Sequence, residues 1–326
     1  MSAIDTPSSV PQASNHDRTR GLHRVIMLVM LLLVVVLPFG VYPIYLMKVM
    51  CFALFALSFN LLFGYAGLMS FGHAAFFGLA SYVAAYTAKY YIAQPEVAVL
   101  AGTLAAGALG VPIGALAIRR HGIYFAMITL AFCQMVYFLA LRTPGFTGGE
   151  DGQQGVPRGH LFGLVDLSYE PALYAFVAVI FLAGFLAVYR IIYSPFGHVL
   201  RAIKENEPRA ISLGYSVNRY KFLAFVLSAT IAGMGGSTKA IVFESASLFD
   251  IHWSMSGEPV LMSLVGGLGT VFGPVVGAAL IIAMETMLIS WGSWITVVQG
   301  AIFVGIVLLF REGIVGNISR RLRVSL

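Results

Sequence analysis

The chain has 326 residues, of which 59 % are hydrophobic and 10 % are charged, and its mean hydropathy is +0.87. A soluble domain carries about 25 % charged residues, so this composition excludes a soluble globular protein and requires lipid as the main solvent. The net charge of +6 is not a nucleic-acid signal in such a chain. Cys51 and Cys133 both lie in apolar segments, which indicates neither a disulfide framework nor a metal site.

The chain begins with a polar stretch, residues 1–24, which we expect to be a disordered cytoplasmic tail. An apolar run follows at 25–47. It is longer than the hydrophobic region of a signal peptide, about 7–15 residues, and no small-residue cleavage site follows it. We therefore expect it to be kept as the first membrane helix.

Long charge-free runs continue along the chain, and a membrane helix needs about 20 apolar residues. After the first, the runs lie at 49–72, 74–88, 97–118, 122–141, 171–189, 222–238, 259–284 and 286–310. Glycines and Pro274 interrupt the run 259–284, so we divide it into a short helix at about 256–268 and a full one at about 271–290. The sequence thus predicts an all-α membrane protein, a polytopic bundle of about ten transmembrane helices.

Charge supports this division, because cytoplasmic loops are enriched in Lys and Arg. Basic residues gather at 18–24, 119–120, 190–221 and 311–323, whereas the segments 142–170 and 241–258 are acidic. Only ten spans place all four basic regions on one side. We expect a permease domain at 25–311, a basic tail at 312–326 and both termini in the cytoplasm.

Two glycine-rich segments, 60–78 and 266–277, contain more glycine than a plain helix needs. Glycines allow either close helix packing or an unwound backbone beside a cavity at membrane depth. Interrupted segments in both halves of a chain can mark internal repeats and a path between them. Both explanations stay open for Gly273 and Gly277.

The cytoplasmic segment 194–214 has the most specific pattern. Leu200 and Ile203 share one helical face, and Pro208 suits the first position of a new helix. Asn206 or Glu207 could cap that helix, and Gly214 could end it. We predict two short cytoplasmic helices within a loop at 194–218, placed to fit a groove on a cytosolic partner.

This segment resembles the cytoplasmic coupling loop of the branched-chain amino-acid ABC importer permeases, which are related to ribose-type permeases. The resemblance extends to 60–78, 147–157, 219–236 and 264–274, in the expected order, and spans most of residues 45–315. It is closest to the longer of the two permeases that such systems use.

The resemblance implies a multi-pass protein of the bacterial inner membrane that forms a heterodimer with a second, homologous permease. Two cytosolic ATP-binding subunits would use the ATP, and a periplasmic binding protein would deliver the solute. This chain would bind no cofactor, would contact lipid and not nucleic acid, and would import branched-chain amino acids, or a related solute such as urea, an amide or an aromatic acid.

The resemblance also implies roles for particular residues. Coupling to the ATPases would fall to Arg201, Ala202, Glu205, Asn206, Glu207, Arg209, Leu213 and Gly214. The acidic, turn-rich segment at 147–157 would dock the binding protein through Thr147, Gly148, Gly149 and Asp151, although a flexible connecting loop explains its composition equally well.

Few polar residues fall inside the predicted spans, so we expect a weakly polar translocation path. Our candidates for that path are Asn60, Ser70, Thr129, Gln134 and Glu285. Ionisable residues inside a membrane are expensive and often functional, which singles out Glu285, although it could simply reach water. Asn60 and Gln134 could equally form hydrogen bonds between helices.

No catalytic or metal motif is present, neither a G-x-x-x-x-G-K-[ST] phosphate loop nor H-E-x-x-H, C-x-x-C or G-x-S-x-G. The chain is therefore predicted to be a transport subunit without its own ATPase site. The alternative is a secondary transporter or channel for a small polar solute, which would leave the cytoplasmic helix pair unexplained. A membrane-embedded enzyme is the third and weakest hypothesis.

Overall fold

The structure is a computed structural model that describes residues 13–288, 295–309 and 313–322, and nearly all of its elements are helices. The helices are α1 Ala13–Val36, α2 Pro43–Asn60, α3 His73–Tyr86, α4 Pro95–Ala117, α5 Ile123–Arg142, α6 Pro144–Thr147, α7 Glu170–Ile192, α8 Pro195–Glu205, α9 Glu207–Ser212, α10 Val217–Val242, α11 Gly257–Gly266, α12 Gly273–Leu288, α13 Ile295–Leu309 and α14 Gly313–Leu322. Two short antiparallel pairs complete the described part: β1 (Gln153–Gln154) with β4 (Ser245–Ala246), and β2 (His160–Leu161) with β3 (Val165–Asp166).

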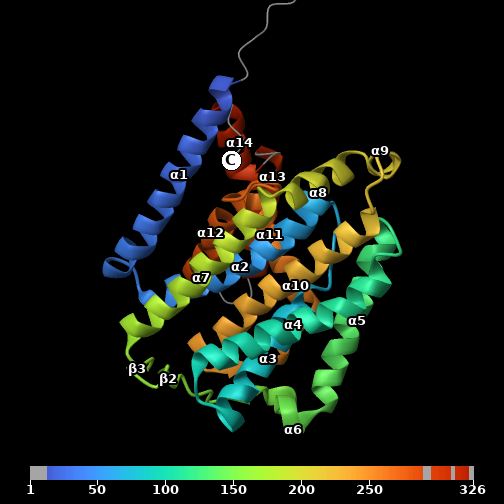
Figure 1. Ribbon diagram of the computed structural model, residues 1–326. Coiled ribbons are helices and arrows are strands. Elements are labelled where there is room, and N and C mark those ends of the chain that lie inside the picture. The colour runs from blue at the N-terminus through green and yellow to red at the C-terminus, as the bar shows by residue number, and fades with distance from the viewer. Residues whose placement is uncertain (1–12, 289–294, 310–312, 323–326) are drawn as a thin grey trace, which may run out of the picture.

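Helix α10 is the centre of the bundle and packs against α2, α3 and α4 (Figure 1). Small residues bring these helices together, since lipid supplies no hydrophobic force between them. At Gly236 the backbone of α10 lies so close to α3 that an added Cβ would overlap the carbonyl of Phe77. Helix α2 packs on α7, α11 and α12 as well as on α10, so it is buried along most of its length.

Five described helices are long and apolar enough to cross a membrane: α2 with its continuation to Tyr65, α4, α5, α7 and α10. Shorter apolar helices lie at 25–39 and 273–288. The protein is therefore an all-α membrane protein, and the count of ten spans stays a prediction.

The two ends of the bundle differ in content (Figure 1). One end holds α8, α9, α14 and the beginning of α1, and we call it the α8 end. The opposite end holds α6 and the short strands, and we call it the strand end. Both ends of the described chain thus lie on the same side as the predicted cytoplasmic helix pair, as the charge pattern requires.

The N-terminal boundaries differ from those expected. Helix α1 begins at Ala13, inside the stretch expected to be disordered, and no proline interrupts it before Pro38. It ends at Val36, and α2 begins at Pro43 rather than after Lys48. Proline and glycine end helices regardless of hydrophobicity, whereas our boundary had followed the charge of Lys48, which lies within α2. The first twelve residues are outside the described part.

Both glycine-rich segments are interrupted helices. The first continues α2 as a π-helical turn, Leu61–Tyr65, and then runs without helix until α3 begins at His73. The second separates α11 from α12 over residues 267–272, where Gly267 and Gly269 have positive φ angles of 125° and 76°. Glycine adopts such angles at little cost, so the expected division of the run 259–284 is confirmed.

Candidate functional site

The predicted helix pair is α8 and α9, and side chains define their boundaries. Ser194 precedes α8 and its Oγ accepts a hydrogen bond from the Gly197 amide at 3.4 Å. Asn206 ends α8 and caps α9, since its Oδ1 accepts from the Arg209 amide at 3.0 Å. Gly214 follows α9 with a φ of +87°, the left-handed conformation that commonly ends a helix.

One face of this pair is exposed and partly apolar. Six of the eight residues assigned to coupling are exposed: Ala202, Glu205, Asn206, Arg209, Leu213 and Gly214. Leu213 is 69 % exposed and its neighbour Ile211 is 58 % exposed, beyond the end of the membrane bundle. Exposed apolar side chains bordered by charges are typical of a surface that binds another protein.

The other face binds the bundle, and two predicted coupling residues lie there. Glu207 pairs with Lys221 of α10 at 2.8 Å, and the Lys221 side chain is only 5 % exposed. The Arg201 guanidinium lies over the Tyr65 ring, 5.0 Å from its centroid. Arg201 and Glu207 therefore fix the pair to the membrane helices, and both stay partly exposed.

Lys204, which the sequence did not single out, makes the most direct link from α8 to the membrane helices. Its Nζ donates to the Gly64 carbonyl at 2.7 Å, in the π-helical turn that continues α2. Carbonyls in the last turn of a helix lack intrahelical donors, so this oxygen is available to a lysine. Burial, and then the nearby Arg201, lower the pKa of Lys204, while Glu205 acts in the opposite direction.

Asn60 joins the two interrupted segments. Its Nδ2 donates to the Thr270 carbonyl at 2.8 Å, and its Oδ1 accepts from the Gly269 amide at 2.9 Å. Its side chain thus satisfies backbone groups of the second interruption from the last turn of α2. A continuous set of contacts runs from Lys204 through Gly64 and Asn60 to residues 269–270.

Of the other path candidates, Ser70 lies in the first interruption and Thr129 contacts it from α5. Ser70 accepts from the Gly72 amide and Thr129 from the Phe71 amide, both at 3.2 Å. Gln134 is half-buried in α5. Only Glu285 among the five lines the pocket described next.

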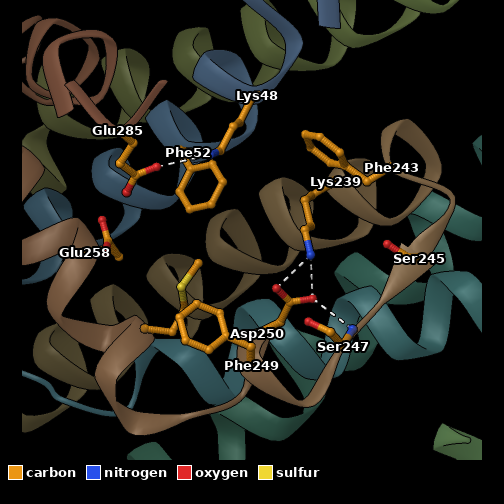
Figure 2. Close-up of a pocket in the computed structure, with 11 residues that line it drawn as sticks. Lys48, Phe52, Lys239, Phe243, Ser245, Ser247, Phe249, Asp250, Glu258 and Glu285 are labelled. Atoms are coloured by element: carbon orange, nitrogen blue, oxygen red, sulfur yellow. Dashed lines mark hydrogen bonds and ion pairs between the residues drawn. The ribbon is translucent and has the colours of Figure 1, made fainter. Parts of the chain in front are cut away.

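A pocket of about 300 Å³ opens at the strand end, between α2, α10, α12 and the segment that leads into α11 (Figure 2). Its charged lining residues are Lys48, Lys239, Asp250, Glu258 and Glu285, and its larger apolar ones are Phe52, Phe243, Phe249 and Met255. This pocket is more highly charged than the weakly polar path that the sequence predicts, and that prediction stays untested. The charged residues of the pocket come from the ends of helices and from the segment 243–258. They therefore lie outside the charge-free runs of the sequence.

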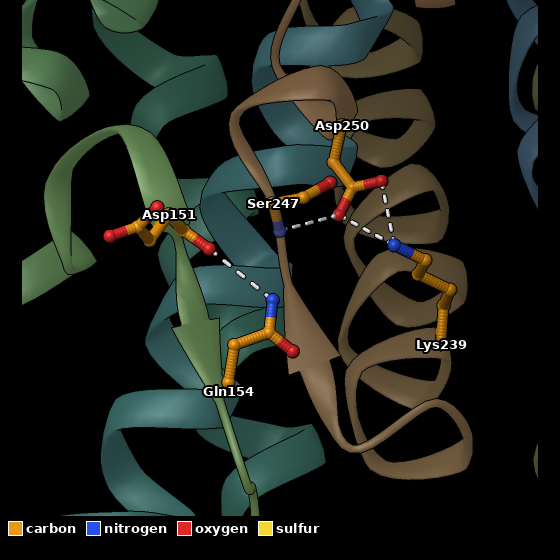
Figure 3. Close-up of polar contacts among 5 residues, drawn as sticks. All are labelled: Asp151, Gln154, Lys239, Ser247 and Asp250. Atoms are coloured by element: carbon orange, nitrogen blue, oxygen red, sulfur yellow. Dashed lines mark hydrogen bonds and ion pairs between the residues drawn. The ribbon is translucent and has the colours of Figure 1, made fainter.

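Two ion pairs organise these charges. Lys239 contacts both carboxylate oxygens of Asp250, at 2.7 and 2.6 Å, and Asp250 also accepts from the Ser247 amide at 3.2 Å (Figure 3). Lys48 contacts one oxygen of Glu285 at 3.0 Å. The first pair is nearly buried, with side chains 13 % and 3 % exposed, and the second is 31 % and 26 % exposed.

The segment expected to dock a binding protein is anchored to the bundle. Thr147 is buried and its Oγ1 donates to the Ala140 carbonyl at 2.6 Å, while Gly148 and Gly149 adopt φ angles of 78° and 69°. Strand β1 then pairs with β4, beside the pocket (Figure 3). Gly148 and Asp151 are exposed, whereas Thr147 and Gly149 are buried, so two of the four predicted docking residues lie on the surface of the strand end.

Comparison with known proteins agrees with this architecture. The sequence model of the family "Branched-chain amino acid transport system / permease component" matches residues 42–310. The chain belongs to this permease family. No solved structure matches it.

The permease is 25 % identical to the "High-affinity branched-chain amino acid transport system permease protein LivM" of Escherichia coli K12, over 85 % of this chain and 70 % of the relative. It is 23 % identical to the "Probable branched-chain amino acid transport permease protein LivM" of Methanocaldococcus jannaschii, over 72 % and 77 %. A shorter match, 30 % identical over 35 % and 36 %, is to the "Autoinducer 2 import system permease protein LsrC" of Klebsiella pneumoniae.

Sequence reasoning missed Lys48 and Lys204 in this permease. Lys48 stood at the edge of an apolar run and was taken as a boundary, although a charge between two apolar runs was a usable signal. Lys204 is one of several charged residues in α8 and α9, and helical spacing alone could not place a carbonyl opposite it.

Proposed function

We propose that the chain is the transmembrane permease subunit of an ATP-binding-cassette importer that moves branched-chain amino acids, or a related small polar solute, into a bacterial cell. A second, homologous permease, two cytosolic ATP-binding subunits and a periplasmic binding protein would complete the transporter. The permease would lie in the inner membrane. Its α8 end would face the cytoplasm, and its strand end would face outward.

The observation that carries this proposal is the two-faced structure of α8 and α9. One face exposes Leu213, Ile211 and charged residues to water, and the other donates a hydrogen bond from Lys204 to the end of α2. A cytosolic subunit bound to the exposed face would therefore move the interrupted part of the bundle when it moves. The rigid connection through Asn60 would pass the displacement to the second interruption.

The charged pocket at the strand end suits an entry site for a polar solute in this scheme. The ordered segment 147–157 and strand β4 lie beside it, where a delivering protein would bind. ATP-driven movement at the α8 end would then alternate access between this pocket and the opposite side.

A secondary transporter is the second candidate, and the ionisable residues of the pocket favour it, because such transporters place charged groups on the path. It would give the exposed face of α8 and α9 no partner. Binding to an ATPase subunit is therefore the property that separates the two candidates.

The test is reconstitution of the chain with the permease, ATPase and binding-protein subunits encoded beside it. We expect the ATPase subunits to co-purify, and the loaded binding protein to stimulate ATP hydrolysis with one solute class among leucine, isoleucine, valine, urea and an aromatic acid. Uptake driven by an ion gradient in proteoliposomes of this chain alone, with no ATPase captured, would establish the secondary transporter instead.

A further inference from the structure

Glu258 is the residue of the strand-end pocket whose charge the two ion pairs leave uncompensated. It is the second residue of α11, and its Oε2 is buried without a hydrogen-bond partner among the described residues. Glu285 and Lys48 line the same pocket. The pocket therefore has two lysines against three carboxylates, and Glu258 is the carboxylate without a direct partner.

A buried carboxylate without a donor is destabilising, and a cationic group that binds it recovers that free energy. The pocket is large for a bare ion, at about 300 Å³, and no group of three His, Cys, Asp or Glu residues that could hold a metal is found in the described part of the chain. Phe52 and Phe249 give the pocket an apolar wall (Figure 2), and Met255 also lines it. This combination fits a cationic group attached to a small hydrocarbon.

Lys48 provides a place for an anion in the same pocket. Its ammonium has a single carboxylate contact, to Glu285, and its side chain is 31 % exposed, so two of its three hydrogens are available to another acceptor. Lys239, in contrast, is held by both oxygens of Asp250. Among the described lining residues, Glu258 is therefore the carboxylate, and Lys48 the ammonium, with the fewest ion-pair contacts.

We infer that Glu258 recognises the ammonium group of a small aliphatic solute in this pocket, and that Lys48 binds the carboxylate of a solute that has one. The inference rests on the proposed function, since it gives a specificity-determining residue to the same permease. It also orders the solute classes: an amino acid uses both groups, an amine uses Glu258 alone, and an uncharged amide such as urea uses neither.

The test measures binding to the purified complex in lipid nanodiscs, without the binding protein, by titration calorimetry. The probes are L-leucine, 3-methylbutylamine, which is leucine without its carboxylate, and 4-methylpentanoate, which is leucine without its ammonium. We expect Glu258→Gln to weaken leucine and the amine by at least ~10-fold, the equivalent of one charge-assisted hydrogen bond, and to leave the acid unchanged.

Lys48→Met is the complementary variant and should weaken leucine and the acid but not the amine. Glu244→Gln is the control, because Glu244 is a carboxylate of the same segment that pairs with Arg158 at 2.9 Å and does not line the pocket. Glu258→Asp, which keeps the charge on a shorter stem, replaces Glu258→Gln if the latter does not fold.

Equal leucine binding by Glu258→Gln and the wild type would overturn the inference, as would amine binding that Glu258→Gln leaves unchanged. Import of an uncharged amide by a wild-type complex that binds none of the three probes would overturn it too. In each case the complex still assembles and hydrolyses ATP, so the proposed function stands. Failure of the proposed function is the separate finding that no ATPase binds the chain.

Discussion

The interrupted segments near the α8 end and the pocket at the strand end are held by different kinds of contact. Between the interrupted segments, side chains bind backbone: Lys204 donates to the carbonyl of Gly64, and Asn60 bonds both an amide and a carbonyl of residues 269–270. In the pocket, the lysine side chains bind carboxylates, as in the pairs of Lys239 with Asp250 and Lys48 with Glu285.

This difference fits the two proposed tasks, coupling to the ATPase subunits and entry of the solute. A contact to backbone moves the main chain directly, so the α8 end is suited to transmit displacement. A side chain in an ion pair can exchange its partner side chain for a charged group of a solute. The strand end is therefore suited to bind a charged solute. Substitutions at the two ends should therefore fail in different ways.

The largest effect is expected from Asp250→Asn at the strand end. It leaves Lys239 as a buried, unpaired ammonium, and breaking a buried ion pair by removal of one partner costs about 3–5 kcal/mol. We expect a large loss of thermal stability, measured by fluorescence-detected size exclusion after heating. Adding Lys239→Met to Asp250→Asn should restore part of it, because both charges are then absent. A single variant as stable as the wild type would show that this pair does not hold the strand end together.

Gly266→Ala should have the next largest effect, at the second interruption. Its new methyl group would overlap the Gly273 carbonyl, where the backbone of α11 contacts that of α12. Overpacking of this kind costs about 1–3 kcal/mol, which the same heating assay would detect. Gly257→Ala is the matched control in the same helix, because its methyl group would meet no atom within 4 Å. Equal stability of the two variants would contradict a backbone-limited contact here.

A functional effect without loss of stability is expected from Glu205→Ala combined with Arg209→Ala. Both residues are exposed on the α8–α9 surface, so the protein should fold and insert normally. We expect weaker capture of the ATPase subunits and uptake lowered several-fold, measured by co-purification and solute flux. Asp151→Ala, an exposed charge at the strand end, should leave ATPase capture unchanged. Normal uptake by the double variant would remove this surface from the coupling account.

The smallest effect on stability is expected from Lys48→Met. Its ion pair with Glu285 is about a quarter to a third exposed, and pairs in contact with water contribute about 1 kcal/mol or less. The heating assay should show a shift much smaller than that of Asp250→Asn. A comparable shift would mean that the pocket depends on this pair as strongly as on the buried one.

The sequence was sufficient for the features that depend on local chemistry. Charge-free runs located the described membrane helices, glycines located both interruptions, and Asn206, Pro208 and Gly214 located the boundaries of α8 and α9. The first boundary was wrong because a lysine was given more weight than Pro38, Gly40 and Pro43.

The sequence was insufficient for contacts between distant segments. Asn60 and Thr270 are separated by 210 positions, and nothing in either segment indicates that they meet. The same holds for Lys204 and Gly64, and for Lys48 and Glu285. Glu285 was singled out because a charge inside an apolar run is costly. Lys48 was discounted because it stood at the end of an apolar run.

The most direct test of the account is the coupling of ATP hydrolysis to import in Lys204→Met, which removes the hydrogen bond to Gly64 and keeps the hydrocarbon stem. The control is Lys89→Met, whose lysine also donates to a backbone carbonyl, that of Gln154 at 2.9 Å, but at the strand end. In reconstituted complexes, we predict that Lys204→Met still captures the ATPase subunits but imports at least ~10-fold less solute per ATP hydrolysed, the loss expected for one strong hydrogen bond, while Lys89→Met matches the wild type. A wild-type ratio of solute imported to ATP hydrolysed in Lys204→Met would contradict the claim that α8 moves the interrupted helix through this bond.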